Sequence, residues 1–207
     1  MKLGLLSDIH ERADLLEAAL ANFVREQVEQ VVVLGDIADL FSDHAQLEET
    51  CRLLRSVNAV GVWGNHDHSL SNSSAAELAE RFAPVVHEFF VALQPRLELK
   101  GCLFTHVEPW LDTAHMPNLW HFGKPDKEDA ERERLFAMTS HRVMFAGHYH
   151  RWLHLTSRKN VPVEGDQIDL SQGRHFVVLG ALCNGQFATY DTTSGTLQRL
   201  DCAATSV

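Results

Sequence analysis

Five short polar motifs, each placed directly after an apolar run, contain the residues of this chain whose types suit metal chemistry. Asp, Asn and His supply oxygen and nitrogen donors, which suit Mn²⁺, Fe²⁺ or Zn²⁺ better than a metal that seeks thiolate. The apolar runs are typical of buried strands, and strand ends that meet at one edge of a sheet would bring the motifs into one cleft. The pattern therefore predicts a two-metal site. In chain order the motifs are Asp8-Ile9-His10, Gly35-Asp36-Ile37-Ala38-Asp39, Gly64-Asn65-His66-Asp67, Thr105-His106 and Gly147-His148-Tyr149-His150, and the runs before them span residues 2–6, 31–34, 59–63, 102–104 and 143–146.

Each motif also has a structural alternative when it is taken alone. Gly-Asp after a strand is usually a turn, Asn-His-Asp is usually a polar loop, and two histidines in a loop often face solvent. Their joint occurrence in one order at five strand ends favours metal binding over five independent turns.

The ordered set of motifs resembles the calcineurin-like metallophosphoesterase superfamily, in particular its small bacterial members. The motifs carry the match from residue 7 to residue 150, and segments 177–180, 188–190 and 195–197 are similar to the closing strands of such proteins. The resemblance implies one domain over residues 1–207 with an α/β fold, an αββα sandwich in which two mixed β-sheets are flanked by helices.

The resemblance also implies two divalent transition-metal ions, Mn²⁺ or Fe²⁺/Fe³⁺ first, with Zn²⁺ or Ni²⁺ as alternatives. Asp36 would bridge them, because one carboxylate can span two cations about 3.5–4 Å apart. A water between the ions would lose a proton near neutral pH, and the resulting hydroxide would attack the phosphate ester. By similarity, one ion would be held by Asp8, His10, Asp36 and His150, and the other by Asp36, Asn65, His106 and His148.

His66 follows Asn65 in the third motif and falls outside the implied ligand set. It would therefore be free to protonate the departing oxygen of the ester. Asp39 would orient His66, since a carboxylate bound to one imidazole nitrogen fixes which nitrogen faces the substrate.

Two places depart from the family pattern. Glu11-Arg12 stands where Gly-Asn commonly follows the first motif, and Val107 stands where Gly commonly follows the lone His. Glu11 is expected to face solvent, because exposed Glu is the rule; the alternative is that it crowds an anionic substrate. Arg12 is a candidate to bind a substrate phosphate through two N–H groups, and its alternative is a surface residue at the start of a helix. Neither departure removes a ligand.

Between the motifs the hydrophobic period changes as an α/β chain requires. Strand and helix alternate in the first half, which predicts parallel strands there. A capping-box pattern predicts a further helix, and two Gly-containing turns predict hairpins. The predicted helices cover residues 15–23, 47–54 and a segment that runs from Ser74 and Glu77 through Leu78 and Phe82, and the hairpins cover residues 96–105 and 187–200.

Residues 108–124 have the least regular pattern, with aromatic residues and histidines among prolines and a glycine. Such a composition suits a loop that covers a site. Trp110 and Trp120 could stack on a base or a phenyl leaving group. The alternative, that both pack the loop onto the domain, stays open.

The length and composition fit one domain that we expect to be cytoplasmic, and a small phosphate ester is the partner that the resemblance implies. A chain of 207 residues with 45% hydrophobic content can bury a substantial core. No apolar stretch reaches the ~20 residues that span a bilayer, so we expect no membrane association. The four cysteines lack CxxC spacing and are expected to be reduced core or surface thiols. A net charge of −10 argues against broad nucleic-acid binding, and the oligomeric state is left open.

The leading function is a dinuclear-metal phosphoesterase acting on a phosphodiester or phosphomonoester, with nucleotide-like substrates favoured. Diesters are preferred over monoesters because few cations flank the motifs. One alternative is a Ser/Thr phosphoprotein phosphatase, which the short chain disfavours. The other is a non-catalytic scaffold of the same fold, which the complete ligand set and His66 disfavour.

Overall fold

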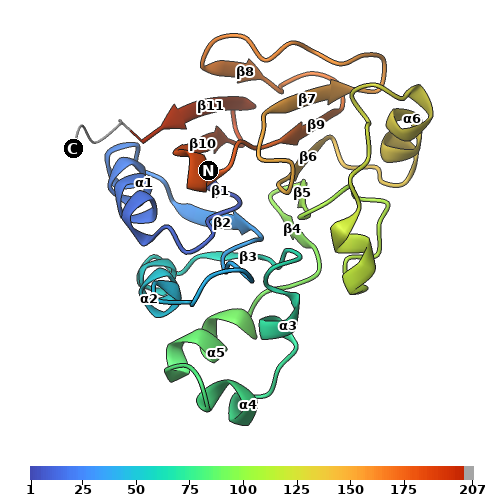
Figure 1. The fold of residues 1–207 in the computed structure, drawn as a ribbon. Helices are drawn as coiled ribbons and strands as arrows, with labels where there is room; N and C mark the ends of the chain where they lie inside the picture. The colour runs from blue at the N-terminus through green and yellow to red at the C-terminus, as the bar shows by residue number, and fades with distance from the viewer. Residues whose placement is uncertain (203–207) are drawn as a thin grey trace.

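Two β-sheets pack face to face in the computed structural model, which describes residues 1–202 (Figure 1). One sheet has the strand order β3 (Val60–Val62), β2 (Gln30–Leu34), β1 (Lys2–Leu6), β10 (Gln186–Asp191), β11 (Thr196–Asp201) and β8 (Gln167–Asp169). The other has the order β4 (Leu97–Leu99), β5 (Cys102–Phe104), β6 (Val143–Ala146), β9 (His175–Val178) and β7 (Leu153–Thr156). Both sheets are mixed, because β1 is parallel to β2 but antiparallel to β10, and β9 is parallel to β6 but antiparallel to β7.

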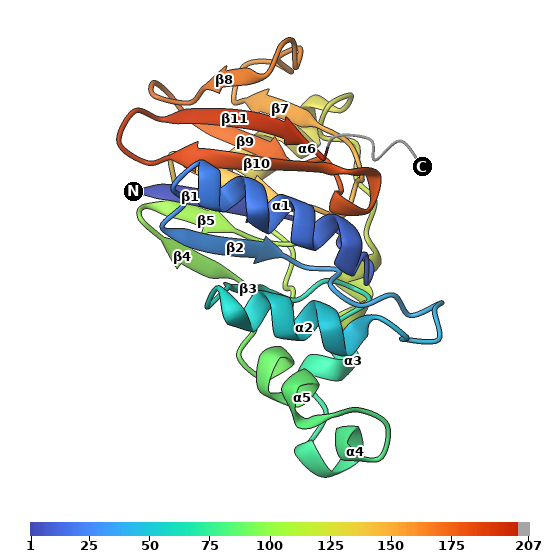
Figure 2. The same cartoon turned by 90° about the vertical axis from the view of Figure 1, so that its left-hand side faces the viewer.

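Helices cover the outer faces of the sheets and confirm the expected αββα sandwich. The helices are α1 (Ala13–Arg25), α2 (Leu47–Ser56), α3 (His68–Ser71), α4 (Ala75–Ala79), α5 (Pro84–Phe90) and α6 (Asp129–Ala137), with 3₁₀ turns η1 (Met116–Trp120) and η2 (Leu182–Asn184). Of these, α3, α4 and α5 pack on one another and on α2, beyond edge strand β3. Figure 2 shows α1 and α2 over the six-stranded sheet, and α6 packs on the five-stranded sheet. Within residues 1–202, none of the helices has the length and apolar character needed to cross a membrane.

Strand β1 shows how the sequence divides its side chains between two layers. Leu3 and Leu5 point into the core between the sheets, whereas Leu6 belongs to the core beneath the helices. Gly4 also faces the helices, and a Cβ there would lie 2.6 Å from the ring of Phe23, so glycine lets α1 approach closely. Successive strand residues point to opposite faces, and this is why continuous apolar runs mark strands that are buried on both sides.

Most elements expected from the sequence are present. The strands before the five motifs, both hairpins, α1 and α2 form close to their expected bounds. The capping box of Ser74 and Glu77 is also present, but α4 ends before Phe82. Pro84 begins α5 and requires an extended conformation at Ala83, so α4 and α5 cannot join into one helix. Strands β7 and β8 were not expected, because both are short and partly polar.

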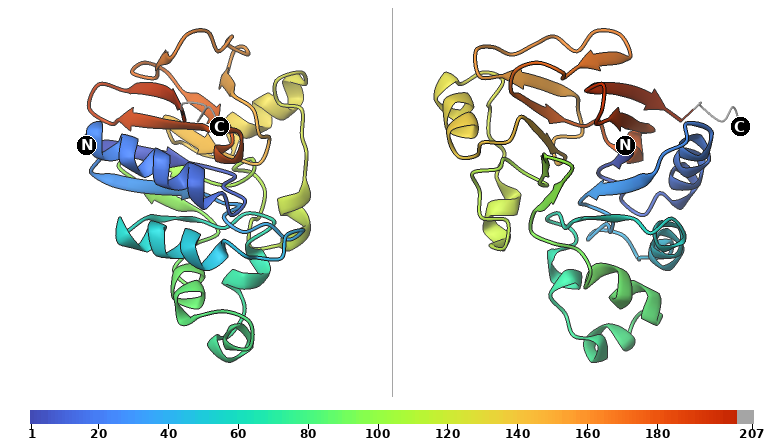
Figure 3. Two further views of the ribbon diagram at one scale, coloured as in Figure 1. Left: turned by 60° about the vertical axis from the view of Figure 1, so that its left-hand side comes forward. Right: turned by 180° about the vertical axis from the view of Figure 1, so that it is seen from behind.

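The parallel strands end on one side of the molecule. In one sheet β1, β2 and β3 are parallel, and in the other β5, β6 and β9 are parallel. Figure 3 shows the segments that follow β2 and β5 on the same side of the ribbon. The five sequence motifs follow five of these strands, and the sixth strand, β9, leads into η2.

Candidate metal centre

Asp8, His10, Asp36 and His150 form a first cluster of donor atoms, here called donor group 1. One donor atom of each lies within 4.8 Å of the others. Nε2 of His150 is 3.4 Å from Oδ1 of Asp8 and 3.2 Å from Nε2 of His10. Nε2 of His10 is in turn 3.9 Å from Oδ2 of Asp36. Two carboxylates and two imidazoles at this spacing could hold one metal ion.

Asp36, His106 and His148 form a second cluster, which with Asn65 is here called donor group 2. Oδ1 of Asn65 is 3.0 Å from Nε2 of His106 and 3.0 Å from Nδ1 of His148. Nε2 of His106 is also 3.4 Å from Oδ2 of Asp36. Asp36 is therefore common to both groups, and the fold brings together every residue that the sequence predicted as a metal ligand.

Backbone carbonyls set the orientation of two of these histidine rings. Nδ1 of His106 donates to the carbonyl oxygen of Leu34 at 2.7 Å, so Nε2 faces the centre. Nε2 of His148 donates to the carbonyl oxygen of His121 at 3.0 Å, so Nδ1 faces the centre. A carbonyl can only accept a hydrogen bond, which fixes the nitrogen that a metal would meet.

The charge of the centre fits a pair of cations. Asp8 and Asp36 are only 0% and 2% exposed. Burial opposes ionisation of Asp36, but nearby His106 and His66 hold its pKa below the usual range. Burial likewise lowers the pKa of His106, and Asp36 outweighs this and raises the pKa to about 9. Divalent ions could supply the positive charge that these histidine protons otherwise provide, and oxygen and nitrogen donors suit Mn²⁺, Fe²⁺ or Zn²⁺.

The backbone at the donors adopts an uncommon conformation. Positive φ values from 46° to 72° occur at Asp8, His10, Asp36, His148 and His150. This left-handed conformation costs about 1–2 kcal/mol for a residue with a Cβ. Such strain persists where surrounding contacts impose it, which is common at functional sites. Close packing contributes here, because a Cβ on Gly64 would collide with Oδ1 of Asp36.

Two buried polar side chains, Ser7 and Asp67, brace the donor loops, and neither was predicted as a site residue. Oγ of Ser7 donates to Oδ2 of Asp8 at 2.6 Å. The carboxylate of Asp67 accepts from the backbone N–H groups of residues 37, 38 and 64, each at 2.9 Å. Asp67 thereby joins the loop after β2 to the loop after β3. The place of Asp67 at the end of the Gly-Asn-His-Asp motif was the feature of the sequence that could have indicated this role.

His66 lies beside donor group 1, with its ring centre 4.7 Å from that of His10. The backbone N–H of Leu40 donates to Nδ1 of His66 at 3.0 Å, so a neutral ring carries its proton on Nε2. Oδ1 of Asp39 is 3.5 Å from the same Nδ1. The closest hydrogen bond to the ring thus comes from the main chain of Leu40, which no side-chain pattern in the sequence indicates.

Glu11 is buried, and the expectation that it faces solvent was wrong. It is 6% exposed, and its Oε1 accepts from the backbone N–H of Asp39 at 3.0 Å. The same oxygen lies 2.6 Å from Nδ1 of His44, which folds back from the loop after β2. Glu11 also has a φ of 58°, a conformation that favours glycine. The glycine of the family pattern is therefore replaced here by a strained residue with two side-chain contacts.

Arg12 lies in a cleft of about 480 Å³ that His10, His66 and His150 also line. Its Nε and Nη2 atoms donate to the carboxylate of Asp14 at 2.8 Å and 2.6 Å. Arg12, the candidate phosphate-binding residue, therefore lines the cleft, but its positive charge is already paired with the carboxylate of Asp14.

The loop of residues 108–124 places its two tryptophans differently. Trp120 is 38% exposed, and its ring centre is 5.7 Å from that of His66. Trp110 is half-buried beneath the guanidinium of Arg134, which lies 3.8 Å from its ring centre. Val107 is fully buried in the apolar cluster that anchors this loop. Trp120 thus lies beside His66, which lines the cleft, whereas Trp110 packs the loop onto the domain.

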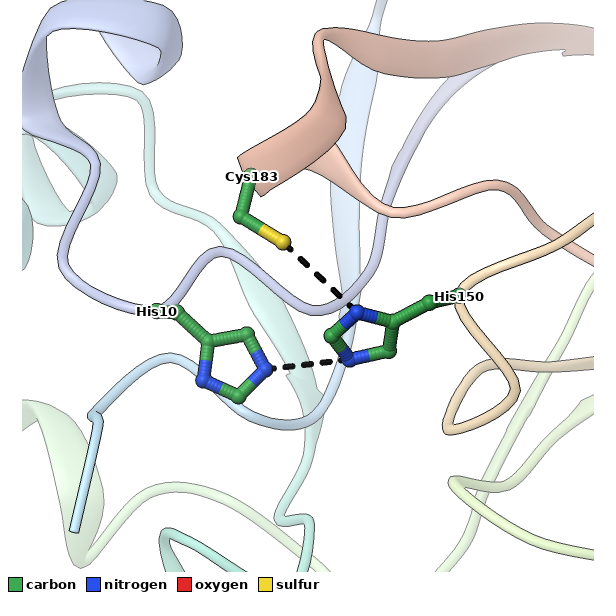
Figure 4. Close-up of side chains that lie close together, drawn as sticks. All are labelled: His10, His150 and Cys183. Carbon is green, nitrogen blue, oxygen red and sulfur yellow. Dashed lines mark hydrogen bonds between the residues drawn. The ribbon is translucent and has the colours of Figure 1, made fainter. Parts of the chain in front are cut away.

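Two further residues of the cleft were not predicted as site residues. Phe41 is 83% exposed, and its ring centre is 5.4 Å from that of His66. Cys183, on η2, places its thiol 3.7 Å from Nδ1 of His150 (Figure 4). No motif surrounds Cys183, so the sequence grouped it with ordinary core or surface thiols.

Comparisons with known proteins agree with this architecture. A family model described as the calcineurin-like phosphoesterase superfamily domain matches residues 1–198. An uncharacterised protein of Methanocaldococcus jannaschii is 20% identical over 192 residues, which cover 85% of this chain and 73% of that protein. A metallophosphoesterase structure from Sphaerobacter thermophilus has a TM-score of 0.75 at 20% identity and covers 97% of this chain and 87% of its own. An archaeal phosphodiesterase structure has a TM-score of 0.56 at 16% identity, with 97% and 99% covered.

Proposed function

Because the chain belongs to the calcineurin-like phosphoesterase superfamily, we propose that it hydrolyses a phosphate ester at a centre of two divalent metal ions. The observation that carries this proposal is the position of Asp36 in both donor groups. One carboxylate shared between two sets of donors is the arrangement that a two-metal hydrolase requires.

Each donor group would hold one of the two metal ions. When bound, two divalent cations would neutralise phosphate oxygens and lower the pKa of a water molecule. Mn²⁺ or Fe²⁺/Fe³⁺ fits the mixture of carboxylate, amide and imidazole donors. Donor group 1 would hold one ion through Asp8, His10, Asp36 and His150, and donor group 2 would hold the other through Asp36, Asn65, His106 and His148.

His66 is the residue that would protonate the departing oxygen. Leu40 occupies Nδ1 through its backbone N–H, which leaves the proton of the neutral ring on Nε2. Protonation of the ring would place a proton on Nδ1 and break the hydrogen bond from Leu40, and Nε2 could then transfer its proton to the leaving oxygen. The carboxylate of Asp39, 3.5 Å from the ring, would stabilise the positive charge of the protonated form.

The charge of the cleft favours a phosphodiester as substrate. Among its lining residues within the described chain, Arg12 is the sole Lys or Arg, and it is already paired with Asp14. A dianionic monoester needs more positive surroundings than a monoanionic diester. Trp120 and Phe41, both beside His66, offer aromatic faces to the base or phenyl group of a nucleotide-like diester.

Hydrolysis of nitrophenyl phosphates by protein loaded with Mn²⁺ or Fe²⁺ tests the proposal. We expect a higher kcat/KM for bis-nitrophenyl phosphate than for the monoester, and turnover of cyclic nucleotides. Asp36→Asn protein purified in parallel should show only background rates, which excludes a contaminating phosphatase. Absence of hydrolysis with every ester would contradict the proposed function. A monoester preference would contradict the substrate class alone.

A further inference from the structure

Cys183 adds a sulfur donor to two histidines of the cleft. One donor atom from each of His10, His150 and Cys183 lies within 4.8 Å of the others. Sγ of Cys183 is 3.7 Å from Nδ1 of His150, and Nε2 of His150 is 3.2 Å from Nε2 of His10. Figure 4 shows the thiol directed at the His150 ring, with His10 beside the opposite nitrogen of that ring.

The backbone fixes this sulfur against the strand end that carries donor group 1. The N–H of Leu182 donates to the carbonyl oxygen of Ser7 at 2.8 Å, and the N–H of Cys183 donates to that of Asp8 at 3.0 Å. Gly185 closes the 3₁₀ turn in the left-handed conformation, with φ of 83°. The thiol is therefore held in place by β1 and η2, and it lines the open cleft.

The three donors have the spacing and chemistry of a soft-metal site. Around a tetrahedral zinc ion, bonds of about 2.3 Å to sulfur and about 2.0–2.1 Å to nitrogen separate neighbouring donors by roughly 3.3–3.6 Å. The separation of 3.7 Å between Sγ of Cys183 and Nδ1 of His150 is close to these values. The separation of 3.2 Å to His10 starts from the opposite nitrogen of His150, so His10 belongs to the cluster because one donor atom from each of the three residues lies within 4.8 Å of the others.

We propose that His10, His150 and Cys183 form a further metal site, distinct from donor groups 1 and 2, for a thiophilic ion such as Zn²⁺ or Cd²⁺. An ion bound there would prevent donor group 1 from holding its own ion. Thiolate with imidazole selects soft or borderline ions, whereas the carboxylates Asp8 and Asp36 favour harder ones. On binding, the thiol of Cys183 releases its proton to solvent, and the thiolate bonds to the ion. Because His10 and His150 serve both sites, an ion held by Cys183 removes two of the four donors of group 1.

Cadmium titration of the metal-free full chain tests the site without any measurement of activity. We expect a thiolate-to-cadmium charge-transfer absorption in the ultraviolet that saturates near one ion per chain. Cys183→Ser should remove this band and weaken cadmium binding at least about tenfold, since even loss of an outer partner of a metal ligand has effects of that size. Cys202→Ser is the matched control, because Cys202 is also half-buried but its Sγ faces the carbonyl oxygen of Leu15.

Circular dichroism would reveal a folding defect in Cys183→Ser. Chemical modification of Cys183 in the folded wild-type protein avoids such a defect. Alkylation of the native wild-type protein with iodoacetamide should modify Cys183, abolish the band and be slowed by one equivalent of Cd²⁺. A band that survives both the substitution and alkylation, or no band in the wild type, would overturn the proposal.

Inhibition of ester hydrolysis by the thiophilic ion rests on the proposed function, and it is measured separately from cadmium binding. In Mn²⁺-loaded protein, Cd²⁺ or Zn²⁺ should inhibit ester hydrolysis, and Cys183→Ser should need at least about tenfold more ion for the same fractional inhibition of its own Mn²⁺ activity. A charge-transfer band with no hydrolysis in any sample would contradict the proposed function and leave the thiophilic site standing. Equal inhibition of both proteins would show that the site does not exclude the ion of group 1.

Discussion

Oε1 of Glu11 lies 2.6 Å from Nδ1 of His44 and also accepts the backbone N–H of Asp39. The residue after the first motif therefore secures both ends of the segment that carries Phe41 into the cleft. Glu11 does this from a left-handed backbone conformation, with φ of 58°. The segment is thus held by a buried carboxylate at the cost of local strain.

Two substitutions of Glu11 should separate the stabilising effect of its side-chain contacts from the destabilising effect of its backbone strain. Glu11→Ala removes both contacts and keeps the strain, and leaving the buried partners unpaired should cost about 1–3 kcal/mol of unfolding free energy. Glu11→Gly removes the same contacts but relieves the strain, so it should be more stable than the Ala variant by about 1 kcal/mol. Urea unfolding measures both differences. Equal stability of the two variants would show that the φ of 58° carries no strain.

Asp36→Asn should reduce the metal content of both donor groups. The neutral amide is a weaker bridge between two cations, so the content should fall from about two ions per chain towards zero. His10→Ala, which alters group 1 alone, should retain about one ion. Elemental analysis after Mn²⁺ reconstitution and desalting gives both values. Loss of a single ion from Asp36→Asn would show that Asp36 does not bridge.

His66→Gln should separate catalysis from metal binding. The variant should keep the metal content of the wild type but hydrolyse esters roughly 10²–10⁴-fold more slowly, because a general acid contributes by that factor. The loss should be largest for poor leaving groups and small for nitrophenolate, which needs little protonation. A series of aryl esters with graded leaving-group pKa measures this. A uniform loss across the series would contradict the proposed acid role.

Trp120→Ala and Trp110→Ala should have different consequences, although the sequence gave both residues the same candidate role. Trp120 lies beside His66, so its removal should narrow the ratio of diester to monoester kcat/KM. Trp110 lies beneath Arg134, so its removal should lower the unfolding free energy by at least about 1 kcal/mol and leave that ratio unchanged. Kinetics with matched esters and urea unfolding distinguish the two. A diester-to-monoester ratio that changes in Trp110→Ala but not in Trp120→Ala would reverse the roles assigned to the two tryptophans.

Metal binding should release protons at neutral pH. The pKa of His106 is about 9, because Asp36 outweighs the effect of burial, and the hydrogen bond to Asp8 raises the pKa of His150 to about 10. Both rings are therefore protonated at pH 7 without metal and must lose a proton to bind it. Apparent affinity should rise with pH until about 9–10. Calorimetry in buffers of different ionisation enthalpy should show release of about two protons, and buffer-independent heats would contradict this.

The strands and the donor residues could be predicted because both leave local patterns, and the family resemblance implied the layers and the grouping of the donors. Apolar runs identified buried strands, and the residues directly after them, such as Asp36 and His106, lie where parallel strands end. Contacts between distant segments gave no such signal. Glu11 is buried in contact with His44, 33 residues away, and His66 accepts the backbone N–H of Leu40. Cys183 reached the cleft because β9 is parallel to β6, a pairing that no motif marks.

Strand β1 lies between β2, which is synthesised soon after it, and β10, which is synthesised near the end of the chain. The backbone N–H of His148 bonds to Asp8 from 140 residues further along the sequence. Both donor groups also require a histidine from the segment after β6. On the ribosome, the first strands and helices must therefore form without help from a metal. Neither donor group is complete before the segment after β6 has been synthesised, so metal acquisition is a late event in the life of this chain.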